Sequence, residues 1–327
     1  MALFHHWTLV TSRTVISCPQ QSHLWQTVFP EIAFQHSYMM HSILSLTALH
    51  LTHLHPSASP AHLPRAAHHH ALALRGFRHD IKAITSANAD ALFATATLVF
   101  LHAFITCTDP HADHPTALAP ATAAAKCTNR TLGSDWIPLI RGIQAILAPA
   151  YEHVRSGPLH STLDVQHWID LLPDAPAQSP DAYNEDDAPL LQLRTTWRHD
   201  PNAATLDETL HLLRHARAWI ARYQRLDASA RASWGYHGDW SAPFIWASLT
   251  PEAYFTLLAQ RQPLALLLFA HFGAVVQRLA GYWWVGDGGK RMVGVVGDLL
   301  GMYWEPWMAW PRRVVGLPWR DSGEGVC

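Results

Sequence analysis

Apolar residues recur at spacings of three and four through most of the chain, which is the periodicity of an α-helix. Helices are expected over residues 3–15, 22–33, 38–55, 64–84, 88–107, 136–147, 190–198, 206–225, 263–284 and 290–300. In 38–55 the shared apolar face comprises Met40, Ile43, Leu44, Thr47, Leu51 and Leu54. No stretch alternates apolar and polar residues as a half-buried strand would. The pattern therefore predicts an all-α, compact, multi-helix fold.

The segment 88–107 is apolar almost all round, through Leu92, Phe93, Val99, Phe100 and Phe104. A helix without a polar face is expected at the centre of a protein core. Its length is borderline for a bilayer, which requires about 20 apolar residues, and it contains His102. We therefore expect a buried core helix rather than a membrane span.

The segment 206–225 has distinct apolar and polar faces. The residues expected to face inward are Leu206, Leu210, Leu213, Ala216, Ile220 and Tyr223. The residues expected to face water are His211, His215, Arg222 and Arg225.

Two stretches lack helical periodicity and are expected to be loops, at about 108–133 and about 150–188. The first is rich in Ala, Thr, His and Pro, and the second combines several prolines with acidic residues. Gly286–Gly289 is expected to form a sharp turn. No cationic, Gly/Ser-rich or repetitive linker divides the chain, so a single domain over 1–327 is expected.

Charge and cysteine content exclude several classes of protein. Only 15% of the 327 residues are charged and the net charge is -2, so no basic face is expected to bind nucleic acid directly. The four cysteines form no Cys-x-x-Cys pair, which indicates reduced thiols. The N-terminus lacks the cationic region of a secretory signal. A location in the nucleus and/or cytosol is expected.

Histidine is abundant, with 24 residues, but no His-Glu-x-x-His arrangement or other strong metal signature is present. No metal and no cofactor are therefore expected. Phosphate-binding glycine loops and nucleophile elbows are also missing from the sequence. Tryptophan is concentrated at the C-terminus, where six of the fifteen residues lie in the last 45 positions. Such large rings are expected to fold over the core, and they can line a pocket as well.

Three stretches together resemble the C-terminal regulatory domain of fungal zinc-cluster transcription factors of the sterol uptake control type. The first runs from Phe4 through Leu24–Pro30 to His36–Leu51, and the second is Asp135-Trp136-Ile137-Pro138-Leu139-Ile140-Arg141-Gly142-Ile143. The third runs from Ala270-His271-Phe272 through Trp283-Trp284 and the glycine turn to Trp304-x-x-Trp307-x-x-Trp310-Pro311.

The resemblance implies an all-helical regulatory domain with a deep apolar pocket, which we expect the Trp-rich C-terminal segment to cover. Its ligand would be a sterol- or terpenoid-like molecule held between the helices at 88–107 and 263–284 and the C-terminal tail. The residues expected to bind it are Phe93, Phe100, Phe104, Phe269, Phe272, Trp283, Trp284, Gly286, Gly288, Gly289, Trp304 and Trp307. The six-cysteine zinc cluster of the full-length family members has no equivalent in this sequence.

The function expected from this resemblance is regulation of transcription in lipid or secondary metabolism, without direct DNA binding. The protein would act as a homodimer, or as a heterodimer with a related factor. An alternative is a natural-product enzyme, a cofactor-independent cyclase or isomerase that uses the same pocket. Its candidate catalytic residues are His41, His102, Arg141 and His271. A further alternative is a longer gene product whose zinc cluster precedes Met1.

Overall fold

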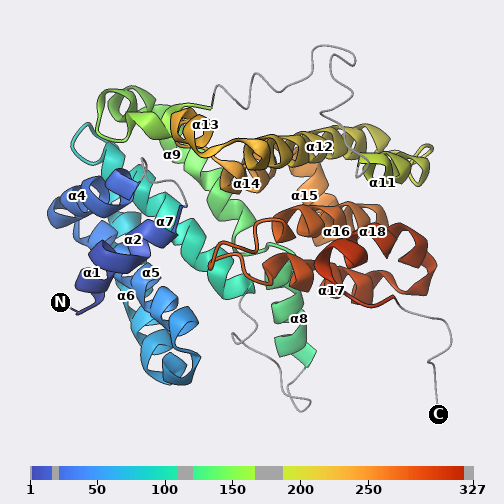
Figure 1. Ribbon diagram of the computed structural model, residues 1–327, viewed down its shortest axis with the longest axis horizontal. Helices are drawn as coiled ribbons and strands as arrows, with labels where there is room; N and C mark the ends of the chain where they lie inside the picture. Colours follow the sequence, from blue (N-terminus) through green and yellow to red (C-terminus); the bar gives the residue numbers. More distant parts are fainter. Residues whose placement is uncertain (1, 17–21, 109–120, 166–186, 320–327) are drawn as a thin grey trace.

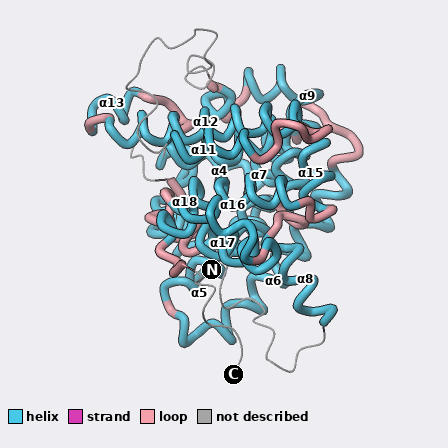
Figure 2. The backbone as a smooth tube through the Cα atoms, turned by 90° about the vertical axis from the view of Figure 1, so that its right-hand side faces the viewer, coloured by secondary structure: helices cyan, strands magenta, loops and turns pink. Residues whose placement is uncertain are grey.

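The computed structural model describes residues 2–16, 22–108, 121–165 and 187–319. Every regular element in these ranges is a helix and none is a strand (Figure 2). The all-α, multi-helix fold predicted from the apolar periodicity is therefore confirmed. The N-terminal helices lie together at one end of the molecule and the C-terminal helices at the other, with α7 running between them (Figure 1).

The N-terminal region is a layer of short and long helices. Its elements are α1 (Ala2–His6), η1 (Trp7–Thr11), α2 (Ser12–Thr14), η2 (Leu24–Val28), α4 (Phe29–Gln35), α5 (Ser37–Leu54), η3 (Pro56–Ala58) and α6 (Ser59–Asp80). The fully buried Trp7 connects η1 to η2, because its indole Nε1 donates to the carbonyl oxygen of Trp25 at 3.1 Å. Helices α5 and α6 pack as an antiparallel pair on one side of α7.

The central helix is α7 (Ala89–Thr108), which agrees closely with the prediction for 88–107. Residues 89–107 are long and apolar enough to cross a membrane, but 78% of the most apolar window is buried inside the protein. Because α5, α9 and α17 cover it on different sides, α7 has the environment of a core helix.

Two helices occupy ranges that the sequence analysis assigned to loops. Helix α8 (Ala121–Thr131) begins in an alanine-rich stretch, where high helix propensity outweighs the weak apolar periodicity. Helix α9 (Ile137–Ser156) continues through Pro149, well past the predicted end near residue 147. A single turn, η4 (His160–Leu163), follows. The parts of the predicted loops at 109–120 and 166–186 lie outside the described residues.

The next layer packs across α9. It contains α11 (Asp187–Gln192), η6 (Leu193–Thr195), α12 (Ala203–Arg225), α13 (Ala228–Ser233), η7 (Asp239–Ser241), α14 (Ala242–Leu249) and α15 (Glu252–Ala259). All six residues predicted to face inward on α12 are buried. His211, Arg222 and Arg225 are exposed as predicted, but His215 is only 3% exposed. The prediction for His215 is wrong because α12 buries a second stripe, which includes Leu212 and Trp219.

The C-terminal layer consists of α16 (Pro263–Gln277), α17 (Gly288–Leu300), η8 (Met302–Trp304) and α18 (Glu305–Val315). Helix α16 ends seven residues before the predicted Trp284, and turns connect it to α17. The backbones of α16 and α17 approach closely where Gly273 faces Gly289. A Cβ atom added to Gly289 would lie 2.6 Å from the backbone nitrogen of Gln277, so only glycine fits there.

Candidate functional site

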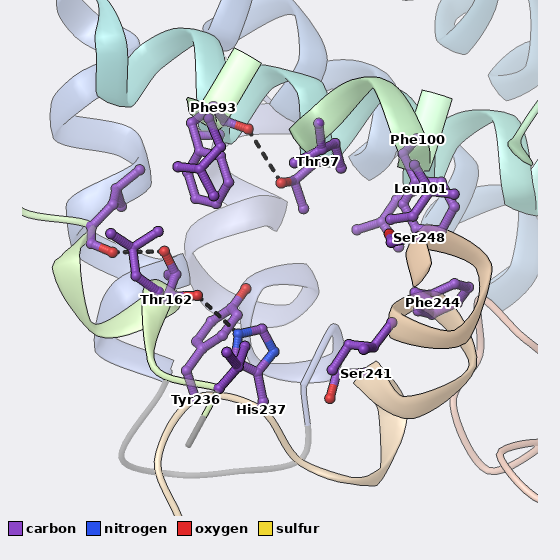
Figure 3. Close-up of a pocket in the computed structure, with 18 of the residues that line it drawn as sticks. Phe93, Thr97, Phe100, Leu101, Thr162, Tyr236, His237, Ser241, Phe244 and Ser248 are labelled. Carbon is purple, nitrogen blue, oxygen red and sulfur yellow. Dashed lines mark hydrogen bonds between the residues drawn. The ribbon is translucent and has the colours of Figure 1, made fainter. Parts of the chain in front are cut away.

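A pocket of about 790 Å³ lies between α7, α9 and α14. Figure 3 shows Phe93, Thr97, Phe100 and Leu101 of α7 along one side, with Tyr236, His237 and Ser241 along the opposite side. The wall also receives Ile140, Ile143, Gln144, Leu147, Ala148 and Tyr151 from α9, and Phe244, Ile245, Ser248 and Leu249 from α14. Most of this lining is apolar.

Large rings hold the pocket open. Phe100 packs edge-to-face against Phe244, with ring centroids 4.8 Å apart, which braces α7 against α14. Between the larger Phe93 and Phe100, α7 presents the small side chains of Ala94 and Thr97, which leave space in front of the helix. Trp284 forms part of the inner wall, and its Nε1 donates to the carbonyl oxygen of Val15 at 2.8 Å. The space therefore has fixed walls rather than being a packing gap.

Several polar side chains line the pocket, and two of them, His237 and Ser241, lie on the side opposite α7 (Figure 3). His237 Nε2 donates to the Thr162 carbonyl oxygen at 2.8 Å, and its Nδ1 is buried without a hydrogen-bond partner among the described residues. Burial lowers the pKa of His237, although the carbonyl of Thr162 and the charge of Asp164 partly offset that effect. The imidazole is therefore neutral near pH 7. Nearby, Ser241 Oγ already donates to the Gly238 carbonyl oxygen at 2.9 Å.

Among the described residues that line the pocket, none is Asp, Glu, Lys or Arg. Burial of a carboxylate, phosphate or ammonium group is unfavourable unless an opposite charge or several hydrogen bonds accompany it. Because these walls carry no charged side chain, the pocket suits a neutral molecule.

Three of the twelve predicted ligand-binding residues line this pocket, namely Phe93, Phe100 and Trp284. The other predicted phenylalanines fill the core behind it. Phe104 packs edge-to-face on Trp136, with centroids 5.3 Å apart, while Phe272 stacks on Trp246 at 4.2 Å. Phe269 is fully buried beside Phe272. These three rings therefore pack between helices and do not line the pocket.

The predicted glycines and C-terminal tryptophans lie away from the pocket. Gly286 has φ +47° in the turn before α17, whereas Gly288 and Gly289 belong to the first turn of that helix. Trp283 stacks on His50, with ring centroids 4.5 Å apart. Trp304 and Trp307 pack on each other and on Tyr303, which is 75% exposed. The expectation that the Trp-rich segment covers the pocket does not hold for the described part of that segment, because no residue in 285–319 lines the pocket.

Two of the candidate catalytic histidines belong to helix interfaces. His41 of α5 and His69 of α6 share a hydrogen bond between their Nδ1 atoms at 3.1 Å, and burial lowers the pKa of both. His102 of α7 stacks on His70 of α6, with ring centroids 3.7 Å apart. Burial also lowers the pKa of His102 well below its usual range. Neither candidate reaches the pocket between α7, α9 and α14.

The other two candidates also lie outside the pocket wall. His271 of α16 is 1% exposed, stacks on Trp310 and donates from Nδ1 to the Leu267 carbonyl oxygen at 2.9 Å. Burial lowers the pKa of this imidazole to about 4. Arg141 of α9 directs its guanidinium towards the end of α14 instead of into the cavity. The described residues contain no cluster of three His, Cys, Asp or Glu side chains that could hold a metal ion.

The sequence analysis missed the pocket residues of 236–249, which include Tyr236, His237, Trp240 and Phe244. A signal for them was present in the sequence. Aromatic residues cluster around Gly235 and Gly238, immediately before Pro243, which is typical of an ordered connection that enters a helix.

Comparisons with known proteins agree with the resemblance seen in the sequence. Residues 2–123 match the family described as the fungal specific transcription factor domain. A Zn(2)-C6 fungal-type transcription factor of Gibberella zeae is 27% identical over 97% of this chain and 62% of its own length. One from Aspergillus fumigatus is 30% identical over 53% of this chain and 42% of its own length.

Sterol uptake control protein 2 of Saccharomyces cerevisiae is 28% identical over 50% of this chain and 17% of its own length. The chain thus spans less than two thirds of the length of each of these relatives. The matches confirm the predicted resemblance. The chain is similar to fungal Zn(2)-C6 transcription factors and to sterol uptake control proteins, and its residues 2–123 match the fungal specific transcription factor domain.

Proposed function

We propose that this protein is a ligand-responsive regulator of transcription whose pocket between α7, α9 and α14 binds a neutral, apolar small molecule. The observation that carries the proposal is a walled, apolar cavity of about 790 Å³ in a transcription-factor-like chain. This volume lies within the range of about 300–1,000 Å³ that is usual for small-molecule sites. A sterol- or terpenoid-like ligand fits both the volume and the uncharged lining.

The regulatory action would pass through a partner. The chain would dimerise with itself or with a related transcription factor in the nucleus and/or cytosol, and the bound ligand would change that association. A ligand shifts such an equilibrium only by its difference in affinity between the two states. The pathway we infer is lipid or secondary metabolism, because the relatives include proteins named for the control of sterol uptake.

Ligand binding is tested with purified protein and two probes of similar size, a fluorescent sterol and a fluorescent fatty acid. We expect the anisotropy of the sterol probe to rise on binding and that of the anionic probe to stay low. Native mass spectrometry after purification from a fungal host would identify a co-purified neutral lipid. Equal binding of both probes, or of neither, would contradict the proposed ligand class.

Regulation is tested in a fungal host by a reporter for a related full-length factor, with and without this chain. We expect reporter output to change, and the change to depend on an open pocket. The variant Thr97→Trp fills the pocket from α7, and Ala145→Trp places the same side chain on the exposed side of α9 as a matched control. Loss of the effect in both variants would contradict a role for the pocket.

A second candidate function is catalysis on an apolar substrate, such as a cyclisation or isomerisation. The observation that favours it is His237, a neutral imidazole in the pocket wall: its Nε2 donates to the Thr162 carbonyl, and its buried Nδ1, without a partner among the described residues, can accept a proton. Gene deletion separates the two functions. An accumulated pathway intermediate with normal transcript levels would favour the enzyme, whereas lowered transcripts would favour the regulator.

A further inference from the structure

Arg141 joins the two helices that form one edge of the pocket. Its Nη1 donates to the carbonyl oxygen of Thr250 at 2.6 Å and to that of Ala247 at 3.3 Å. The same nitrogen lies 3.5 Å from the carbonyl oxygen of Ser248. These carbonyls belong to the last turn of α14 and the residue after it, where the helix leaves oxygens without internal donors. The guanidinium thus caps the C-terminus of α14 from α9.

Two further contacts fix the guanidinium in this position. Its Nη2 lies 3.0 Å from Glu252 Oε2, in the first turn of α15. Its Cζ lies 5.1 Å from the centroid of the Phe255 ring, a cation–π distance. Because the Glu252 side chain is 75% exposed, the ion pair contributes little, and the carbonyl contacts are the principal ones.

The residues on either side of this cap line the pocket. Ile140 precedes Arg141 on α9, and Gln144 follows one turn later. Ser248 and Leu249 of α14 form the wall beside the capped carbonyls. The cap therefore sets the separation of α9 and α14 at this edge.

The pocket opens to solvent along the same two helices, because α9 and α14 carry exposed residues of its lining, including Gln144 one turn after Arg141. Leu249 of α14 is 50% exposed and Tyr151 of α9 is 44% exposed, although both line the pocket. Exposed apolar side chains that continue into an apolar cavity mark a route for an apolar molecule. The mouth thus lies between the two helices that Arg141 joins.

We propose that Arg141 is a latch at the mouth of the pocket, a positioning residue that controls how fast a ligand passes between α9 and α14. This inference rests on the proposed ligand binding. When the latch releases, the last turn of α14 moves away from α9 and the mouth widens. The walls deeper in the pocket, at Phe93, Phe100 and Trp284, keep their contacts.

The variant Arg141→Met tests the latch because it keeps an unbranched side chain over Phe255 and removes every donor. Stopped-flow fluorescence would measure association and dissociation of the fluorescent sterol, well below the melting temperature of each variant. We expect both rate constants to rise about tenfold, the factor that corresponds to about 1.4 kcal/mol, with a smaller change in Kd. Glu252→Gln should change the rates less than about twofold, since exposed pairs contribute little.

The matched control is Arg194→Met, which breaks an ion pair with Asp207 on η6 and α12, away from the pocket. It should leave both rate constants unchanged. Unchanged rates in Arg141→Met, or an equal rise in Arg194→Met, would overturn the latch.

A second measurement does not depend on any ligand. Hydrogen exchange followed by mass spectrometry should show faster amide exchange over residues 245–252 in Arg141→Met than in the wild-type protein, with α7 unchanged. If the wild-type protein binds no sterol probe, the proposed function fails while this exchange still tests the latch. Unchanged exchange over 245–252 would overturn the latch even where ligand binding is confirmed.

Discussion

The contact between α16 and α17 and the pocket between α7, α9 and α14 are both built from apolar helices, yet one is closed and the other is open. At the first, Gly273 and Gly289 let two backbones meet with no space for a methyl group. At the second, paired rings such as Phe100 and Phe244 keep the helices apart and leave about 790 Å³. The difference teaches that residue size at the crossing point, rather than apolar content, decides whether helices enclose a cavity.

The largest effect is expected where the helices are closest. Gly289→Ala should lower the free energy of unfolding by about 3 kcal/mol, because the new Cβ would overlap the backbone of α16. Urea denaturation followed by circular dichroism measures the change. Gly142→Ala is the matched control, since a Cβ at Gly142 meets no atom within 4 Å. Equal stability of the two variants would contradict the account of the closed contact.

The free energy of unfolding should also fall at acid pH, because the C-terminal layer contains the buried His271. Burial lowers the pKa of His271 to about 4 in the folded chain. Between pH 6.5 and pH 4 this histidine is therefore protonated in the unfolded chain and neutral in the folded chain. The stabilisation by neutral His271 is complete above pH 6.5 and is lost as pH falls towards 4.

His271→Phe should reduce that acid-induced loss by about 3 kcal/mol, whatever the variant's stability at pH 7. Urea midpoints between pH 7 and pH 4 measure it. Burial also lowers the pKa values of His50 and His70 to about 4, so the variant should still lose part of its stability as the pH falls. The exposed His211→Phe serves as the control, and an identical slope in both variants would refute the assignment.

A smaller effect on stability is expected in the open region. Thr97→Trp adds a large side chain to α7, but the cavity accepts it, so the free energy of unfolding should change by less than about 1 kcal/mol. Binding of the sterol probe should be lost. A destabilisation as large as that of Gly289→Ala would show that the pocket is not an open space.

The smallest effect concerns the helix that carries the latch. Gly142 lies inside α9 with open space around its Cα, so Gly142→Ala should stabilise the protein by up to about 1 kcal/mol. A thermal melt measures the increase. Destabilisation by this substitution would contradict the open space around Gly142.

The sequence predicted the position of helices with strong apolar periodicity well. It predicted less well which of their residues are buried. The inward residues of α12 followed from spacing alone, and α7 followed from its continuous apolar run. Spacing shows neither how wide the buried face is nor what packs on it. For that reason His215 was expected in solvent and was found buried.

The pocket was predicted only in part, for a related reason. A sequence shows where aromatic residues occur but not which of them leave space in front of them. Phe93 and Phe100 border the cavity, whereas Phe104, on the same helix, is enclosed by Trp136 and Phe244. Arg141 could be noticed as a candidate, but its role depends on carbonyl groups 106 to 109 residues away in the sequence.

The core position of α7 has a consequence for synthesis of the protein. As the chain leaves the ribosome, residues 89–107 emerge after α5 and α6 but before α9, α17 and Trp284, so part of the apolar surface of this helix stays uncovered until its later partners are made. During that interval it resembles a membrane anchor to the cell's targeting machinery. A slower synthesis of the C-terminal half would therefore lengthen the time for which this apolar surface is exposed.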